Sequence, residues 1–328
     1  MDIELTPRPT GKKYDAWAAF LHRAGLTPDE GVQTTALIWE DDTLIAAGSR
    51  QDNVLKCIAV DPMHQGEGLT ATLLTQLRQD AMADGHRHLF LYTKPRNKTM
   101  FSSLFFYPVA KTDQVLLMEN RKNGVQEFVN GLDAPGTDGV VGAVVMNCNP
   151  FTKGHRYLIE TAAEECDRLY VFVLSEDKSF FPAADRLALV RAGTADLPNV
   201  TVHPTGPYLI SSATFPTYFL KDQSQFETIH CQLDIEVFAN YFVPKFGITR
   251  RYVGSEPLSP VTNQYNEALL RHLPEKGVEV RLLQRVENAE GPISASAVRA
   301  LLHTNQPELL KTLVPETTFA YLKEKELI

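Results

Sequence analysis

The clearest pattern along the chain is a run of apolar residues from Val140 to Met146, which predicts a parallel strand that is buried on both faces. After this run, apolar residues at helical spacing predict helices over residues 154–165 and 184–193. Further apolar runs predict later strands over residues 169–174, 200–203, 251–254 and 278–283. Strands that alternate with helices are typical of a doubly wound, Rossmann-like α/β domain, in which ligands bind at the carboxyl ends of the strands.

The N-terminal half has a different pattern of apolar residues. Five short strands are predicted, over residues 34–40, 43–47, 55–60, 89–92 and 115–118. Apolar residues at helical spacing predict one helix around Trp17 and another over 69–82. We therefore expect a mixed α+β domain that is mostly sheet with a few helices.

Between the two halves, residues 130–139 are rich in turn formers and poor in apolar residues. This stretch predicts a linker, with an N-terminal domain over residues 1–132 and a C-terminal domain over 138–328. Residues 1–130 carry 14 basic and 16 acidic side chains, and the remainder carries 18 and 24. Neither half has a polybasic run, so neither has the charge pattern of a nucleic-acid binder.

The net charge of −8 also argues against a nucleic-acid partner. It leaves room for a small phosphate-rich ligand, which needs only a local site. The four cysteines are far apart in the sequence and form neither a disulfide framework nor a zinc motif. Since the sequence shows neither an apolar leader nor a membrane-spanning stretch, we expect a cytoplasmic protein with reduced thiols and no membrane partner.

The strongest chemical signal follows the first apolar run, where the chain reads Asn147-Cys-Asn-Pro-Phe-Thr-Lys-Gly-His155. Thr152, Gly154 and His155 are predicted to open a helix directly after a buried strand. The free backbone N–H groups of a helix N-terminus can bind phosphate, and a glycine permits close approach because it has no Cβ. A histidine in the first turn can stabilise developing negative charge.

A second candidate anion site is the segment Ile293-Ser-Ala-Ser-Ala-Val-Arg299. Ser294 is a good N-cap, Ser296 lies in the first turn of the predicted helix, and Arg299 lies about one turn further on. Two hydroxyls, free N–H groups and a guanidinium would together hold an anion. Alone, the segment would be interpreted as an ordinary capped helix, and its weight comes from its pairing with the first motif.

The two motifs together resemble the nucleotidylyltransferase superfamily, whose members have an (H/T)xGH motif and a later ISxS/T-xxR motif. Their reaction is an attack on the α-phosphate of ATP, with pyrophosphate leaving. The resemblance implies that Thr152 and His155 contact the α- and β-phosphates, and that Ser294, Ser296 and Arg299 hold the β- and γ-phosphates. Mg²⁺ would help to neutralise the triphosphate, although the sequence shows no cluster of metal ligands.

Five segments narrow the resemblance to the citrate lyase ligase family: NPFTKGHRYLIE (149–160), SFFPAADRLALV (179–190), SSATFPTYFLKD (211–222), VGSEPLSPVTNQYN (253–266) and GPISASAVRALL (291–302). They cover nearly the whole C-terminal half, and the N-terminal half fits the layout of that family. The resemblance implies an AMP-forming acetate–thiol ligase. ATP and acetate would give acetyl-adenylate, and the acetyl group would pass to the thiol of a dephospho-CoA-type prosthetic group on the acyl carrier protein of citrate lyase, which activates the lyase.

Several candidate contacts within these segments stay open. Asn149 would orient the nucleotide or only fix its own turn, and Phe151 is a further candidate for nucleotide contact in that turn. Arg186 would hold a phosphate or lie on a solvated helix face. A polar cluster would either order a loop or contact acetate: Ser211, Ser212 and Thr214.

In the N-terminal half, the stretch 60–70 lies between a predicted strand and an amphipathic helix. It resembles the pyrophosphate-binding loop of GNAT N-acetyltransferases, a (Q/R)xxGx(G/A) pattern. Gln65 and Gly68 match this pattern, while Thr70 replaces the usual small final residue. The resemblance implies that backbone N–H groups from Gly66 onward bind the diphosphate of a CoA-like ligand.

The same half departs from a working acetyltransferase. Such enzymes often have a Tyr in the next helix and a Gly before its last Phe, and Phe101 and Phe105 take these places here. A phenyl ring cannot protonate a departing thiolate. The N-terminal domain is therefore expected to bind a phosphopantetheine-type arm without chemistry of its own, or to be a scaffold without a ligand. His86 and His88 form a pair for which no third metal ligand is evident.

Two other functions fit the same phosphate motifs. A nucleotidylyltransferase that makes a dinucleotide or a dephospho-CoA-type product would use them with another acceptor. A non-enzymatic sensor of acyl-CoA and adenine nucleotide would bind without turnover. Of the three, we expect the ligase, with ATP, acetate and the carrier protein as its partners.

Overall fold

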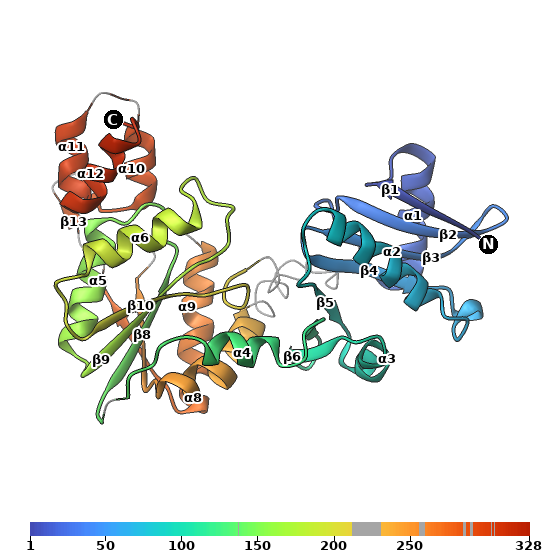
Figure 1. Cartoon of the computed structure of the whole chain (residues 1–328), viewed down its shortest axis with the longest axis horizontal. Coiled ribbons are helices and arrows are strands. Elements are labelled where there is room, and N and C mark those ends of the chain that lie inside the picture. The colour runs from blue at the N-terminus through green and yellow to red at the C-terminus, as the bar shows by residue number, and fades with distance from the viewer. Residues whose placement is uncertain are drawn as a thin grey trace. The chain divides into compact units, whose positions relative to one another are not determined.

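The computed structural model of the chain forms two compact units, coloured along the chain in Figure 1. It describes residues 1–136, 138–211, 231–255, 260–284, 287–288, 291–302, 304 and 306–328. Within these, the first unit consists of residues 1–125 and 231–236, and the second of the remaining residues from 126 onward. The division along the chain falls inside helix α4 (Gly124–Asn130).

The first unit is built on a seven-stranded sheet with the order β1-β2-β3-β4-β5-β7-β6. Its strands are β1 (Asp2–Pro7), β2 (Thr34–Glu40), β3 (Thr43–Gln51), β4 (Val54–Val60), β5 (Phe90–Thr93), β6 (Tyr107–Lys111) and β7 (Leu116–Glu119). All neighbours are antiparallel except β4 and β5. That parallel pair is joined only through Val54 with Phe90 and Leu55 with Leu91, so the two strands separate toward their carboxyl ends.

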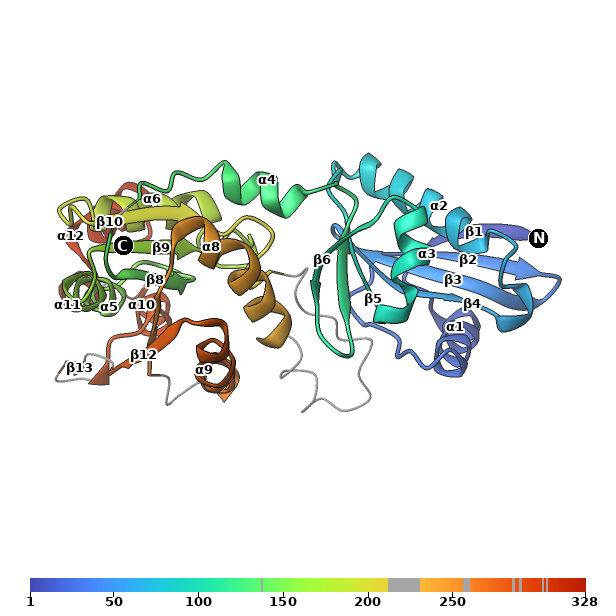
Figure 2. The ribbon, with the colours of Figure 1, turned by 90° about the horizontal axis from the view of Figure 1, so that it is seen from below.

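Two helices cover opposite faces of this sheet, α1 (Gly11–Arg23) and α2 (Leu69–Ala83), as Figure 2 shows. Helix α2 buries Leu69, Leu73, Leu74 and Leu77 against β2, β3 and β4, which is the apolar stripe that its spacing predicts. A short helix, α3 (Lys98–Ser103), follows β5. The expected α+β domain is therefore confirmed.

The sequence prediction missed two strands of this sheet and shortened a third. Strand β1 is an edge strand with exposed apolar side chains, and β6 contains Pro108 at a bulge, so neither shows a buried alternation. Strand β3 continues beyond Ala47 because the polar side chains at its end are buried and have hydrogen-bond or ion-pair partners. Ser49 shares a 3.0 Å hydroxyl hydrogen bond with Thr35, and Arg50 pairs with acidic residues of α2.

The second unit contains a five-stranded, all-parallel sheet with the order β10-β9-β8-β11-β12. Its strands are β8 (Val141–Met146), β9 (Arg168–Val173), β10 (Val200–Pro204), β11 (Arg250–Gly254) and β12 (Glu279–Leu283). This is the doubly wound order, and it confirms the predicted Rossmann-like domain. The order reverses between β8 and β11, so the carboxyl end of β8 lies at the switch point where such sheets bind ligands.

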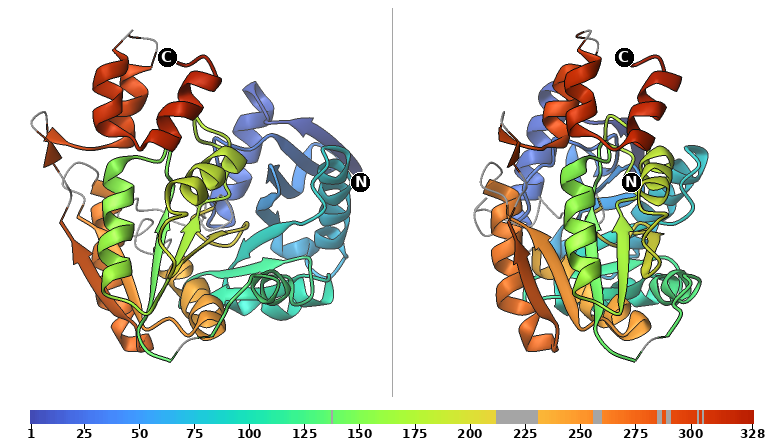
Figure 3. Two further views of the ribbon diagram at one scale, coloured as in Figure 1. Left: turned by 60° about the vertical axis from the view of Figure 1, so that its left-hand side comes forward. Right: turned by 90° about the vertical axis from the view of Figure 1, so that its left-hand side faces the viewer.

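Helices connect and cover this sheet. They are α5 (Lys153–Glu164), α6 (Ala183–Gly193), the π-helical turn η5 (Phe238–Phe242), α8 (Val243–Phe246) and α9 (Pro260–His272). Three short C-terminal helices follow, α10 (Ala295–Leu301), α11 (Pro307–Leu313) and α12 (Glu316–Glu324). Figure 3 shows these three side by side at the end of the second unit where α5 begins, and Lys153 Nζ donates to the carbonyl of Lys311 at 2.7 Å.

The segment that the sequence marks as a linker is held by the second unit. His203 Nε2 donates to the carbonyl oxygen of Asp133 at 2.7 Å, and the Tyr170 hydroxyl donates to that of Pro135 at 3.0 Å. These bonds tie residues 133–135 to the side of the sheet formed by β9 and β10.

Candidate active site

The turn from β8 into α5 is locked by hydrogen bonds between its own residues. The peptide bond from Asn149 to Pro150 is cis, and the buried Thr152 is the N-cap of α5. The Thr152 hydroxyl accepts from the backbone N–H of His155 at 3.3 Å, while His155 Nδ1 accepts from the backbone N–H of Thr152 at 3.1 Å. This is a capping box in which a histidine takes the place of the usual Glu or Gln.

The capping box decides which nitrogen of His155 can donate. Since Nδ1 accepts a backbone hydrogen bond, the neutral ring carries its proton on Nε2. The imidazole also lies parallel to the Phe151 ring, with 6.1 Å between ring centroids and 13° between ring planes. His155 is thereby oriented by the fold as an Nε2–H donor, which suits the stabilisation of phosphate charge.

The second motif meets the first in this turn. Arg299 Nη1 donates to the carbonyl oxygen of Asn149 at 2.5 Å, across 150 residues of sequence, and Arg299 Nη2 donates to the Ser296 hydroxyl at 3.0 Å. A Cβ on Gly154 would lie 2.9 Å from the carbonyl oxygen of Ile293, so only glycine fits there. The two helix N-termini that the sequence singled out therefore lie against each other.

Ser294 has the capping role that the sequence predicts. Its hydroxyl accepts from the backbone N–H of Ala297 at 3.1 Å and begins α10. Together, the structure brings Thr152, Gly154, His155 and the 294–299 segment to one end of the parallel sheet.

Arg186 lies in the interior of the second unit. Its side chain is 0% exposed, so the alternative that it lies on a solvated helix face is wrong. The guanidinium donates to four backbone carbonyls: that of Asn147 directly after β8 (3.0 Å), and those of Leu174 (2.9 Å), Glu176 (2.6 Å) and Phe181 (3.0 Å) in the segment between β9 and α6. Through these hydrogen bonds, Arg186 positions two loops of the site.

Two further candidate nucleotide contacts, Asn149 and Phe151, lie in the turn between β8 and α5. Phe151 is 0% exposed and packs against Gly193, where a Cβ would approach its ring to 2.4 Å, so it is a core residue behind His155. Asn149 uses its side-chain oxygen to accept from the backbone N–H of Phe181 at 2.9 Å. This bond supports the alternative that Asn149 fixes the turn, which it does by joining it to the 175–181 loop.

Asn147 is a positioning residue that the sequence analysis missed. Its side-chain oxygen accepts from Arg186 at 2.5 Å, and its amide donates to the Ser179 hydroxyl at 3.1 Å. The available signal was an asparagine directly after a buried strand. Of the predicted acetate contacts, Ser211 donates to the carbonyl of Pro207 at 2.8 Å, and Ser212 and Thr214 lie outside the described residues.

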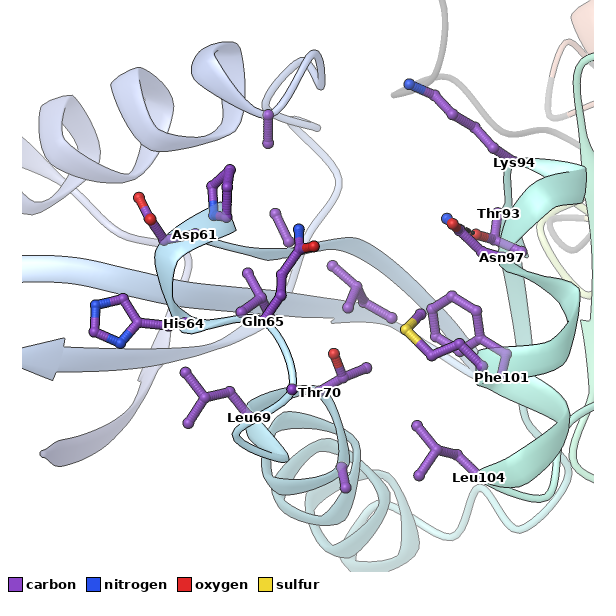
Figure 4. A pocket seen from close by; sticks show the side chains of 18 of the residues that line it. Asp61, His64, Gln65, Leu69, Thr70, Thr93, Lys94, Asn97, Phe101 and Leu104 are labelled. Carbon is purple, nitrogen blue, oxygen red and sulfur yellow. Dashed lines mark hydrogen bonds between the residues drawn. The ribbon is translucent and has the colours of Figure 1, made fainter.

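The phosphate-type loop of the first unit opens onto a cavity of about 930 Å³. Gln65, Gly66 and Gly68 line it, together with the separated ends of β4 and β5 and with residues of α1 and α3. Gly66 (φ +94°) and Gly68 (φ +79°) are left-handed and exposed, and a Cβ on either would meet nothing within 4 Å. Figure 4 shows Gln65 and Thr70 on one side of the cavity and Thr93, Asn97 and Phe101 on the other.

Phe101 of α3 and Phe105 just after it are the residues at which the sequence departs from acetyltransferases. Phe101 is buried and lines the cavity, where it offers no proton. Phe105 is 67% exposed with φ +61°, a backbone conformation that favours glycine. His88 Nε2 lies 2.6 Å from Glu119 Oε2, so its partner is a carboxylate of β7.

The cysteines offer no nucleophile to either site. All four are free and buried. Burial raises the pKa of Cys57 to about 12, and burial also raises the pKa of Cys148, which lies in the turn after β8. Both remain protonated at neutral pH, which makes them unreactive.

A protein-held metal does not fit the described part of either unit. Within it, no group of three or more His, Cys, Asp or Glu side chains could hold a metal ion. In the same part of the chain, no helix is both long and apolar enough to cross a membrane.

Both halves of the chain match families of known proteins. The family model described as the citrate lyase ligase C-terminal domain matches residues 141–322, and that of the acetyltransferase (GNAT) family matches residues 4–101. The chain is 41% identical to the citrate (pro-3S)-lyase ligase of Klebsiella pneumoniae over 313 residues, which cover 93% of this chain and 91% of the relative. It is 40% identical to the Escherichia coli K12 protein of the same name, over 96% of this chain and 92% of the relative.

Among solved structures, Thermotoga maritima TmcAL bound with alpha-thio ATP matches with a TM-score of 0.36 and 16% identity, over 57% of this chain and 56% of that chain. An acyl-CoA N-acyltransferase from Pseudomonas aeruginosa matches with a TM-score of 0.33 and 14% identity, over 37% of this chain and 100% of that chain. Likeness at this level bears on neither mechanism nor ligand.

Proposed function

The chain belongs to the citrate lyase ligase family and is a ligase that activates citrate lyase, and from this premise we propose that its second unit forms acetyl-adenylate from acetate and ATP. The observation that carries the proposal is the junction of the two phosphate motifs. Arg299 reaches the carbonyl of Asn149, and Ile293 lies against Gly154. One triphosphate could therefore contact both helix N-termini at once.

In the first step, an acetate oxygen attacks the α-phosphorus of ATP. The bond from that phosphorus to the bridging oxygen breaks, and pyrophosphate leaves. Acetate is already ionised at neutral pH, so the step needs no general base. What it needs is donors for the phosphate charge, and His155 Nε2–H with the N-terminal N–H groups of α5 would supply them.

In the second step, the thiol of the carrier's dephospho-CoA-type arm attacks the acetyl carbonyl carbon. The bond to the phosphate oxygen breaks, AMP leaves, the thiol proton goes to solvent, and a thioester remains. The loop around Gln65, Gly66 and Gly68 would hold the arm's diphosphate in the cavity of the first unit. Because Phe101 offers no acid, this unit would bind the arm without transferring its acetyl group.

Any Mg²⁺ would arrive with the phosphates of ATP. The described residues do not offer a cluster of ligands for it, and no step above depends on it.

ATP–pyrophosphate exchange on the isolated protein, with and without acetate, tests the proposed first step. We expect exchange only with acetate, and we expect His155→Ala to lower its rate by about 10²-fold or more if the ring stabilises the transition state. Exchange without acetate would indicate another adenylyl acceptor. No exchange under any condition, or an unchanged rate in His155→Ala, would contradict the proposed chemistry.

A further inference from the structure

The cavity of the first unit has a lining that is more basic than acidic, although the whole chain is acidic. Arg23, Lys94 and Arg96 line it, and among the described lining residues the only carboxylate is Asp61. That carboxylate accepts from the backbone N–H of Met63 at 2.9 Å, so it serves its own turn. The lining thus has net positive charge within a half of the chain that carries more acidic than basic side chains.

These cations are not neutralised by the protein. Lys94 and Arg96 lie two positions apart between β5 and α3, and neither has an ion-pair partner within the part of the chain that the structure describes. The same holds for Arg23, whose guanidinium lies 5.8 Å from the centre of the Phe20 ring.

Some other cations of this unit are paired. Arg50 bonds to Asp80 and Asp84, and Lys56 Nζ lies 2.8 Å from Asp29 Oδ2. Exposed cations elsewhere in the described part of the unit, such as Lys111 and Lys122, also have no ion-pair partner there, so the cations at the cavity are distinguished by their place in its lining, where they remain able to bind an anionic ligand.

Their placement complements the glycine loop. In Figure 4, Lys94 belongs to the same side of the cavity as Thr93 and Asn97, opposite Gln65 and Thr70. The loop offers backbone N–H groups, which give directional hydrogen bonds but no net charge. Lysine and arginine side chains supply net charge, which acts over longer distances and speeds the capture of an anion.

We propose that Arg23, Lys94 and Arg96 form a cationic rim that captures the phosphate-bearing arm of the carrier protein. The inference rests on the proposed function, because it takes the arm as the occupant. A dephospho-CoA-type arm has a diphosphate that is anionic at neutral pH, and its neutral remainder would extend along the cavity between the separated ends of β4 and β5. The rim sets how fast and how tightly the loaded carrier binds, and it takes no part in adenylation.

The test compares two double variants of the full chain. Lys94→Gln with Arg96→Gln removes two rim charges, and Lys111→Gln with Lys122→Gln removes two exposed charges of the same unit away from the cavity. We measure kcat/KM for acetylation of the holo-carrier at low and at physiological salt, and acetate-dependent ATP–pyrophosphate exchange in parallel.

For the rim variant we expect kcat/KM to fall about tenfold at low salt through a higher KM, and to fall less at higher salt because ions screen the attraction. Exchange should match that of the wild type, and the control variant should keep its kcat/KM. The proposal would be overturned by an unchanged kcat/KM in the rim variant, or by equal losses of kcat/KM in both variants. A loss that salt does not reduce would also overturn it.

Equilibrium binding of free dephospho-CoA separates this proposal from the proposed function. If the wild type shows no acetate-dependent exchange, the proposed chemistry fails, and the rim is still tested by the dissociation constant. A weakening of about tenfold in the rim variant alone supports it, and equal constants in all three proteins overturn it. If the rim variant weakens the binding of ATP but not that of dephospho-CoA, the cations would belong to the nucleotide, which would overturn the proposal as well.

Discussion

The two phosphate-type loops of this protein use glycine for opposite reasons. In the first unit, Gly66 and Gly68 have φ values of +94° and +79°, and a Cβ would meet nothing within 4 Å. In the second unit, Gly154 lies outside the left-handed region, but a Cβ would come within 2.9 Å of the carbonyl oxygen of Ile293. One loop needs glycine for its backbone conformation, and the other needs it for space.

The charged groups around the two loops also differ, in how firmly the protein holds them. Around the second loop, His155 and Arg299 make hydrogen bonds to backbone groups of the turn that precedes α5. Around the first, Lys94 and Arg96 have no ion-pair partners among the described residues. A site that accelerates a reaction gains from groups held in place before the substrate arrives. A site that only captures a flexible arm does not need this order, and the difference suggests a division of labour between the units.

The largest effect is expected from Arg186, whose donors hold two loops of the ordered site. Arg186→Met would leave several buried carbonyls without donors, and we expect a loss of about 3 kcal/mol or more in the free energy of unfolding. Urea unfolding measures this. Arg191→Met, at an exposed position of the same helix, is the matched control and should stay within about 0.5 kcal/mol of the wild type. A loss no larger than that of the control would contradict the role of Arg186.

Gly154→Ala should push Ile293 away from the α5 turn and thereby separate the two motifs. We expect a destabilisation of about 1–3 kcal/mol, as for other overpacked sites, together with slower exchange. Gly131→Ala is the control in the same unit, because its Cβ would be no closer than 3.4 Å to its neighbours. Thermal unfolding and exchange rates of the two variants should differ, and equal values would show that the close approach is unimportant.

At Gly68, the stability of a variant should depend on the backbone conformation that its side chain permits, and not on the space around it. At φ +79°, alanine is strained by about 1–2 kcal/mol, whereas asparagine tolerates the left-handed region better. In urea unfolding, Gly68→Asn should therefore be more stable than Gly68→Ala, although it has the larger side chain. The reverse order would mean that space is limiting at the first loop too.

The smallest expected effect is a pH dependence confined to the second unit. Desolvation lowers the pKa of His203 from its ordinary 6.5, against the opposing effect of its hydrogen bond to Asp133. As the pH falls below 6.5, the unfolded chain takes up a proton that the folded state resists, so stability is lost toward acid. The slope from this group cannot exceed about 1.4 kcal/mol per pH unit. His203→Gln should remove that slope between pH 7 and 5, and a wild-type slope in this variant would assign it to other groups.

Much of the second unit could be predicted because its signals are local. A continuous apolar run, a proline turn and Thr152-x-Gly154-His155 follow each other directly, and a buried parallel strand has few other interpretations. Edge strands β1 and β6 lack such a signal, since one exposes its apolar side chains and the other contains Pro108.

The site residues show where pattern analysis stops. An arginine that binds phosphate and one that binds buried carbonyls are identical in sequence, so Arg186 could not be assigned without its neighbours. The burial of Phe151 could likewise not be predicted from the motif alone. The contact of Asn149 with Arg299, 150 residues apart, was not predicted, because the family resemblance paired the two motifs without specifying which residues touch.

The division of labour is tested most directly by measuring two activities on the same two variants. Exchange reports adenylation, and acetylation of the holo-carrier reports the whole reaction. Gln65→Glu places a negative charge in the first loop without changing its backbone, and Gln114→Glu, at another exposed position of the same unit, is its control. We expect His155→Ala to lose both activities and Gln65→Glu to keep exchange while losing carrier acetylation. Loss of exchange in Gln65→Glu, or full carrier acetylation in it, would contradict the division.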